Sequence, residues 1–498
     1  MNAEANRALD QGDVEAALAI YHTITAGNAS PRELLEHATL LLQLYRSGES
    51  LALFDRLLEH PATTVDQLMM AAKLWFQRGR FTDCARFSGR ALEDSPDSPD
   101  IAAMHAAALE RSGEKEEARE VITSILAKHP NHARSIRLLA HIERRDGNFD
   151  HAQSLLRHHL QQFPSEDDWR LRYELATVLD RLGDYTAAMR ELALAKSQLE
   201  PASNTFRPQW RAMAARQWAV TRSLTKDRLK RWADSSGTMT QHLCLMAGFP
   251  RSGTTLLEQV LSAHPACIGT DESGILATQF RDPLIFGAAS AEDAVAELDS
   301  FEREDLAAGR AEYLRCTADV LGEDPTGKLL IEKDPLLTPD LALPLRLFPG
   351  AKILMPLRDP RDVVISFYFT IVPGAANSVA AATLAETCQY YAEVMKHWLW
   401  LREQLDSSRW MESRYEDLIG APEDQTRRLA NFLGIDWQAG MLAHHRRSDD
   451  RAVRTPTYDD VSKPLYLRSL ERWRHYEEAL APHLHHLEPY IDAFGYAR

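Results

Sequence analysis

One stretch, His242 to Pro265 (HLCLMAGFPRSGTTLLEQVLSAHP), constrains the fold of this chain more than any other. Residues 243–247 are apolar and residues 248–250 are Gly-Phe-Pro, which predicts a buried strand that ends in a turn. From Thr254 onward the apolar residues follow helical spacing, which predicts a helix. A strand, a glycine turn and a helix form a cradle for an anion, because backbone N–H groups and the positive end of the helix dipole converge there.

The loop between this strand and helix adds charge and hydroxyl donors to the cradle. Its candidate anion-binding residues are Arg251, Ser252, Gly253, Thr254 and Thr255. The spacing from Gly248 to Gly253 equals that of the nucleotide-triphosphate P-loop, but Thr254 stands where that loop carries its lysine. Kinases and NTPases use this lysine on the transferred phosphate, so its absence argues against an atypical P-loop kinase.

The pattern Pro-Arg-Ser-Gly-Thr-Thr-Leu over residues 250–256 resembles the 5′-phosphosulfate loop of the sulfotransferase family. That family takes its sulfuryl group from 3′-phosphoadenosine-5′-phosphosulfate (PAPS) and releases 3′-phosphoadenosine-5′-phosphate (PAP). The resemblance therefore implies PAPS as donor, a parallel-sheet α/β domain and a catalytic as well as a binding role for Arg251. The alternative is an ordinary strand-to-helix turn.

Further segments match the same family, and with the loop they cover most of residues 240–475. In Gly269-Thr-Asp-Glu-Ser-Gly274, resemblance to the tyrosylprotein branch makes Glu272 the general base, with Asp271 as the alternative. A buried carboxylate with a raised pKa suits that task. Both residues could instead cap a helix.

The segment Glu332-Lys333-Asp334-Pro335 follows the predicted strand at residues 329–331. A lysine at the carboxyl end of a strand can face the same crevice as the anion loop. By resemblance, Lys333 stabilises charge on the bridging oxygen as sulfate is transferred. We expect Asp334 to orient the turn.

The segment from Leu357 to Ser366 resembles the family's 3′-phosphate site. Arg358 follows a predicted strand at residues 353–355, and Ser366 lies in the second turn of the next predicted helix, so both can face one phosphate. We expect Arg361 to pair with Asp359 or Asp362 instead of binding the ligand.

Later segments complete the expected cofactor site. Tyr415 is the last residue of a predicted strand (residues 410–415) and lines the nucleotide pocket by resemblance. Residues 454–464 resemble the family's closing loop, with Thr455 or Thr457 and Lys463 as candidate ligands, unless this is simply a solvated loop. The histidine groups at 444–445 and 483–486 lack metal-site spacing, and we expect no metal.

A second constraint is a repeat through the first two hundred residues. Glycines recur at Gly12, Gly48, Gly79, Gly113, Gly147 and Gly183. Most of these glycines have a small residue five residues after them and another seven residues before them. Three of the glycines are followed seventeen residues later by a proline (Pro96, Pro130 and Pro164). This pattern resembles the tetratricopeptide repeat: glycine turns the chain, small residues let helices approach, and proline ends the second helix. Such arrays bind peptides or partners, or serve as spacers and dimerisation elements.

Length, charge and cysteine content limit the possible domain division, binding partners and compartment of the protein. The 498 residues predict helical repeats at 1–200, a helical linker at 201–239 with a break at Pro201, and a sulfotransferase domain at 240–498. A formal net charge of -15 disfavours nonspecific nucleic-acid or membrane binding. Five scattered cysteines, no signal peptide and no long apolar run predict a cytoplasmic protein.

These features predict a PAPS-dependent sulfotransferase that acts on a hydroxyl or amine acceptor of unknown identity, with the repeats recruiting a partner or acceptor. The alternatives are a repeat scaffold with a non-catalytic nucleotide-binding domain, and the atypical kinase.

Overall fold

The computed structural model describes residues 2–237, 241–372, 376–446 and 470–497. The chain forms two compact units, Met1–Asp184 and Tyr185–Arg498. The first is helical throughout its regular structure, and the second holds a parallel sheet with helices. The predicted fold class, helical repeats followed by an α/β domain, is confirmed.

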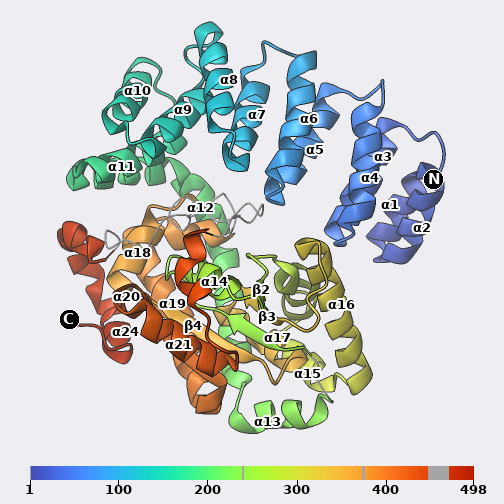
Figure 1. Ribbon diagram of the computed structural model, residues 1–498, viewed down its shortest axis with the longest axis vertical. Coiled ribbons are helices and arrows are strands. Elements are labelled where there is room, and N and C mark those ends of the chain that lie inside the picture. Colours follow the sequence, from blue (N-terminus) through green and yellow to red (C-terminus); the bar gives the residue numbers. More distant parts are fainter. Residues whose placement is uncertain (1, 238–240, 373–375, 447–469, 498) are drawn as a thin grey trace. The chain divides into compact units, whose positions relative to one another are not determined.

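The first unit is a row of antiparallel helix pairs that follow one another in chain order (Figure 1). Its helices are α1 (Asn2–Asp10), α2 (Val14–Thr25), α3 (Pro31–Gln43), α4 (Ser47–Glu59), α5 (Val65–Gln77), α6 (Phe81–Asp94), α7 (Pro99–Ser112), α8 (Lys115–Lys128), α9 (Ala133–Arg145), α10 (Phe149–Gln162) and α11 (Trp169–Leu182).

The repeat pattern read from the sequence has a direct structural meaning. Small residues after the glycines (Ala17, Cys84, Ala118, Ala152 and Ala188) and before them (Ala5, Ala72, Ala106, Ala140 and Ala176) are all 0% exposed. Helices α6, α8 and α10 each end two residues before their proline, since the residue preceding proline disfavours helical backbone. The repeats therefore pack through close helix contacts at fixed positions.

The second repeat breaks the pattern already in the sequence, with Leu41 and Leu53 where other repeats have small residues and with an early Pro61. Gly48 was expected to turn the chain, but it lies in the first turn of α4. Tyr45 takes the left-handed conformation instead, with φ of 54°. Its side chain is buried, so packing offsets the strain of a non-glycine residue at positive φ.

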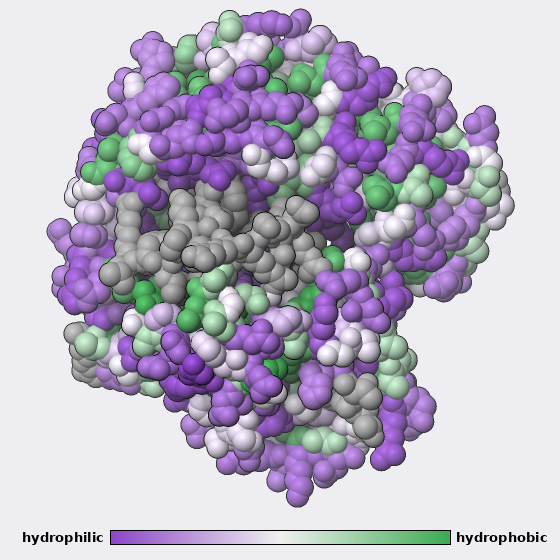
Figure 2. Space-filling model, viewed as in Figure 1, coloured by the Kyte–Doolittle hydropathy of each residue, from purple (hydrophilic) through white to green (hydrophobic). Residues whose placement is uncertain are grey.

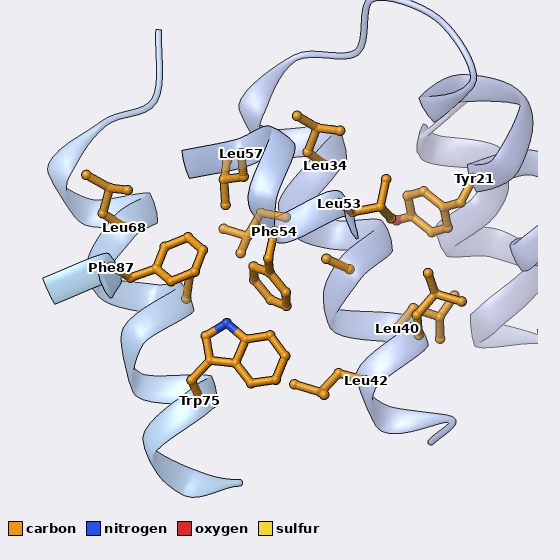
Figure 3. Close-up of a cluster of buried hydrophobic side chains, with 14 of the residues drawn as sticks. Tyr21, Leu34, Leu40, Leu42, Leu53, Phe54, Leu57, Leu68, Trp75 and Phe87 are labelled. Carbon is orange, nitrogen blue, oxygen red and sulfur yellow. The ribbon is translucent and has the colours of Figure 1, made fainter. Parts of the chain in front are cut away.

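Leucine and aromatic side chains pack together in the core of the first repeats (Figure 3). The Phe54 ring lies 5.0 Å from Trp75 and 5.7 Å from Phe87, measured between ring centroids. These three residues come from α4, α5 and α6, so the core is continuous from one helix pair to the next. Such shared burial is why stacked repeats are stable where a single one is not.

The second unit begins with one long helix, α12 (Tyr185–Ser223), followed by α13 (Lys226–Ser235). The expected break at Pro201 is wrong, because α12 runs through both Pro201 and Pro208. Buried side chains flank the prolines, and Arg207 pairs with Glu386 at 2.8 Å. Packing against the rest of the unit thus outweighs the local helix-breaking tendency. Residues 185–200 also belong to this unit rather than to the repeats.

The sheet of the second unit has five parallel strands in the order β2-β3-β1-β4-β5. Its strands are β1 (Leu243–Met246), β2 (Cys267–Gly269), β3 (Leu329–Lys333), β4 (Lys352–Leu357) and β5 (Trp410–Arg414). The strands predicted at 243–247, 329–331, 353–355 and 410–415 are all confirmed. In the central strands β1, β3 and β4 nearly every residue is buried, as a sheet covered on both faces requires.

Helices surround this sheet. The longer ones are α14 (Thr254–Ser262), a π-helix η1 (Leu276–Phe286), α15 (Ala291–Ser300), α16 (Arg303–Leu321), α18 (Pro360–Tyr368), α19 (Leu384–Gln404) and α21 (Pro422–Leu433). The shorter ones are η2 (Thr338–Asp340), α17 (Ala342–Leu347), η3 (Ala376–Ala381), η4 (Ser407–Arg409), α20 (Tyr415–Gly420), η5 (Ala439–Arg446), η7 (Arg472–Tyr476), α23 (Glu477–Leu480), η8 (Ala481–His486) and α24 (Glu488–Ala493). The apolar face of α14 packs on β1, β2 and β3, which fixes the start of this helix beside the ends of the strands.

Hydrophilic residues predominate on the face seen in Figure 2, with hydrophobic residues scattered between them. Within the described ranges, no helix combines the length and apolar character that a membrane span needs.

Candidate active site

The candidate residues gather because the ends of all five strands meet at one edge of the sheet. In a parallel sheet the carboxyl ends of the strands lie together, and ligands bind in the crevice beside them. Strand β1 leads into the anion loop, β2 into Asp271 and Glu272, and β3 ends at Lys333. Arg358 directly follows β4, and Tyr415 directly follows β5. Every predicted segment within the described residues therefore reaches this edge.

The anion loop is held open by two glycines with left-handed backbone. Gly248 has φ of 123°, and a Cβ there would lie 3.3 Å from the carbonyl oxygen of Pro356. Its N–H donates to Thr338 Oγ1 at 2.8 Å, and the same hydroxyl donates to its carbonyl at 2.6 Å. Gly253 has φ of 91°, and a Cβ there would lie 2.7 Å from the Tyr415 ring. Larger residues would close the cradle at both points.

The predicted 5′ and 3′ anion sites share contacts. Arg251, itself at φ of 77°, donates from Nε to Ser366 Oγ at 3.0 Å. Arg358 donates from Nη1 to the carbonyl oxygen of Arg251 at 3.3 Å. The Arg358 guanidinium also lies 5.2 Å from the centroid of the Tyr415 ring. The two predicted anion sites are thus joined by direct contacts between their own residues.

The acidic residues beside Arg358 have structural partners. Arg361 forms an ion pair with Asp359 at 2.7 Å, one of the two pairings predicted from the sequence. Asp362 accepts from the N–H groups of Glu471 at 2.9 Å and Trp473 at 2.8 Å. Burial raises the pKa of Asp362 to about 6. This carboxyl therefore ties the C-terminal segment to the start of α18.

Lys333 lies at the centre of a carboxylate cluster. Its side chain is 0% exposed, and Nζ lies 3.1 Å from Asp271 Oδ1, 3.1 Å from Glu272 Oε1 and 3.3 Å from Glu258 Oε2. The predicted base and the predicted catalytic lysine are thus direct partners. Asp271 and Glu272 do not cap a helix but adopt positive φ of 47° and 57°. As expected, Asp334 orients the turn, since its Oδ1 accepts from the N–H of Leu336 at 2.8 Å.

Burial and neighbouring charges shift the pKa values of this cluster in opposite directions. Burial raises the pKa of Glu272, and the neighbouring Lys333 ammonium moderates that rise. The three carboxylates raise the pKa of Lys333 despite its burial, so the lysine stays charged. Burial also raises the pKa of Glu332 to about 7; this residue accepts a hydrogen bond from the Tyr313 hydroxyl at 2.6 Å.

Glu258 is the member of this cluster that the sequence pattern did not reveal. It lies on α14 among buried apolar residues and is 2% exposed. A charged residue within the apolar face of Leu256, Leu257, Val260 and Leu261 was the available signal. Gly269 leaves room for it, because a Cβ at that position would overlap the Glu258 carboxyl group.

The remaining predicted residues are either buried in the anion loop or outside the described part of the chain. Ser252, Thr254 and Thr255 are buried in the loop, at 3%, 4% and 7% exposure. Thr455, Thr457 and Lys463 lie outside the described residues. Across the described part of the chain, no group of three His, Cys, Asp or Glu side chains is arranged to hold a metal ion.

Comparisons with known proteins agree with this division of the chain. Residues 244–439 match the sulfotransferase family, and residues 76–142 match the tetratricopeptide repeat. An uncharacterized protein of Aquifex aeolicus is 24% identical over 83% of this chain and 53% of its own length. A protein-tyrosine sulfotransferase of Drosophila melanogaster is 25% identical over 46% of each chain. The chain spans about half the length of these two relatives.

Among solved structures, the sulfotransferase domain of the Synechococcus PCC 7002 olefin synthase is similar at 19% identity, with a TM-score of 0.33 over 48% of this chain and 90% of that chain. The family matches fall on the two units that the fold separates, and the sulfotransferase match spans the anion loop, Lys333 and Arg358. The second unit of this chain thus carries a match to the sulfotransferase family, and the first unit a match to the tetratricopeptide repeat.

Proposed function

We propose that this protein transfers a sulfuryl group from PAPS to a hydroxyl or amine acceptor. The observation that carries the proposal is the shared contact network of Arg251, Ser366 and Arg358, beside the pair of Glu272 and Lys333. Two anion sites this close suit a nucleotide with phosphate on its ribose and an anionic group at its 5′ end.

The residues of the anion loop fit such a donor. The two left-handed glycines leave space where a Cβ would contact Pro356 or Tyr415. Ser252 Oγ is buried and has no hydrogen-bond partner within the described residues, so it can donate to a bound oxygen. The loop opens α14, whose N-terminus favours negative charge.

In the proposed step the acceptor oxygen or nitrogen forms a bond to sulfur as the bond between sulfur and the bridging phosphate oxygen breaks. Glu272 accepts the acceptor's proton. The bond's electron pair goes to the bridging oxygen, which leaves with PAP, and Lys333 stabilises the charge that develops there. Catalysis then consists of positioning and electrostatic stabilisation.

We further propose that the repeats recruit a partner or a protein acceptor. Stacked helix pairs present extended surfaces that commonly bind peptides. The acceptor site proper differs from that of the tyrosylprotein branch, because Gly274 and Thr278 stand where that branch, by resemblance, has arginines that read acidic peptides. An acidic peptide is therefore a less suitable acceptor for the catalytic site than a saccharide, a lipid, a small metabolite or a differently charged peptide.

Two experiments test this proposal. In a thermal-shift titration, PAP should stabilise the protein more than ATP does; a preference for ATP would favour the kinase alternative. In a transfer assay, [35S]PAPS and a cell extract should yield a labelled product that fractionation can identify. Binding of PAP without any labelling would favour the non-catalytic scaffold.

A further inference from the structure

Glu258 has contacts that link the two parts of the catalytic pair. One carboxylate oxygen, Oε1, accepts the backbone N–H of Asp271 at 2.9 Å. The other, Oε2, forms an ion pair with Lys333 Nζ at 3.3 Å. Its side chain therefore bridges the end of β3 and the loop that follows β2.

The fold keeps a buried charge where an apolar side chain would be less costly. Burying a carboxylate among apolar residues is unfavourable unless it is paired and hydrogen-bonded, and well-packed apolar residues often replace such pairs without loss. Here the rest of the buried face of α14 is apolar, apart from its two threonines, and Gly269 accommodates the Glu258 carboxyl group. A specific function for the charge explains this arrangement better than stability does.

We propose that Glu258 is a positioning residue that holds Lys333 and the Glu272 loop in register and keeps Lys333 in place when Glu272 becomes protonated. This inference rests on the proposed sulfuryl transfer. In the resting cluster Lys333 has three carboxylate partners. Once Glu272 has accepted the acceptor's proton, its attraction for Lys333 weakens. Asp271 and, at pH values above about 7, ionised Glu258 remain as the anionic partners.

The charge on Glu258 also affects the pKa of Glu272, the proposed base, because both carboxylates contact Lys333. The charged groups that face Glu258 are Lys333 from β3 and Asp271 from the loop after β2, and Lys333 in turn contacts Glu272. Burial raises the pKa of Glu258 to about 7. Removing this carboxylate leaves Lys333 more available to Glu272, which stabilises ionised Glu272 and lowers its pKa.

The test uses the full chain, [35S]PAPS and the extract fraction that the wild type labels. Glu258→Gln retains an acceptor for the Asp271 N–H but removes the charge. We expect turnover at saturating donor to fall by about 10- to 100-fold, the typical cost of a misplaced catalytic group. Affinity for PAP, measured by calorimetry, should stay within about 2-fold of the wild-type value, a negligible change in binding free energy. The acid limb of the pH profile should move to lower pH, and Glu258→Asp should recover part of the turnover.

Gln259→Ala, the neighbouring substitution on α14, serves as the matched control and should keep the wild-type profile. Wild-type turnover and pH profile in Glu258→Gln would overturn the inference while leaving the proposed function intact. Loss of PAP binding together with a large drop in melting temperature would also overturn it, since Glu258 would then serve folding. If the wild type labels nothing in the extract, the proposed function fails first, and this inference fails with it.

Discussion

Arg358 donates a hydrogen bond from Nη1 to the main-chain carbonyl oxygen of Arg251 at 3.3 Å. This contact joins the residue after β4 to the loop after β1, two neighbouring strands of the sheet. It orients the Arg358 guanidinium relative to the backbone segment that carries the Arg251 side chain. The distance between the two proposed anion sites is thereby set by the protein, before any nucleotide binds.

Replacing Lys333 should separate chemistry from binding. Lys333→Ala removes the positive charge proposed to stabilise the leaving oxygen, so we expect turnover to fall by about 100- to 1000-fold, as for other lost oxyanion donors. PAP affinity, measured by calorimetry, should change little. Lys328→Ala, which removes an exposed partner of Glu323, is the control and should remain active. Retained turnover in Lys333→Ala would exclude the assigned role.

Arg358 should discriminate nucleotides by their 3′-phosphate. Arg358→Ala is expected to weaken PAP binding by about 10- to 100-fold, the value of a lost hydrogen bond to a charged group, while AMP affinity stays nearly the same. Calorimetric titrations with both nucleotides measure the ratio. Arg427→Ala, at an exposed ion pair with Glu423, should leave the ratio unchanged. Equal losses for PAP and AMP would remove Arg358 from the 3′ site.

The pH dependence should report Glu272 as the base. A base acts when ionised, and burial raises the pKa of Glu272, so kcat/KM should fall as the pH drops through a value above that of an ordinary glutamate. Below that value the rate should decrease about tenfold per pH unit. Asp271 also raises the pKa of Glu272, so Asp271→Asn should move the acid limb to lower pH. Abolished activity in Asp271→Asn, with activity kept in Glu272→Gln, would make Asp271 the base.

Because of Glu332, the free energy of unfolding should fall as the pH rises. Its folded-state pKa of about 7 lies above the unfolded value, so the folded state holds a proton that the unfolded state releases first. The stabilisation from this group is complete below the unfolded pKa of about 4.3 and is lost as the pH rises through about 7, by roughly 4 kcal/mol in total. Glu332→Gln should flatten this part of the curve in denaturant titrations between these pH values. Parallel curves for the two proteins would contradict the prediction.

Gly253 should be intolerant of alanine for a steric reason. Gly253→Ala places a Cβ 2.7 Å from the Tyr415 ring and demands positive φ, so we expect a loss of about 1–3 kcal/mol in stability and weaker PAP binding. Gly434→Ala is the matched control: it has φ of 77° but its nearest atom is 3.9 Å away. Adding Tyr415→Ala should relieve part of the loss in Gly253→Ala, as a double-mutant cycle would measure. Equal losses in the two glycine variants would show that backbone strain alone is responsible.

Patterns with local physical causes could be predicted from the sequence. The strand, turn and helix around Arg251 follow from apolar periodicity and glycine placement, and the structure confirms all three. The repeat period likewise predicted where small residues, such as Ala118 and Cys84, let helices approach, and in the structure these residues are fully buried. Family resemblance added the roles of Glu272 and Lys333, which remain proposals, and the structure shows that the two are in contact.

Other features depended on contacts between distant parts of the chain. Proline at position 201 locally predicts a helix end, yet α12 continues because its flanking residues pack within the second unit. Tyr45 replaces a glycine at a turn because its ring is buried.

By itself, the sequence determined the order of elements, the repeat spacing and the residues at the strand ends, since these depend on near neighbours along the chain. Only the tertiary structure decided that Glu258 faces Lys333, because that contact requires α14 to pack over β2 and β3 after the parallel sheet has formed. A buried charge can be recognised from sequence as unusual, but its partner is known only when the strands lie side by side.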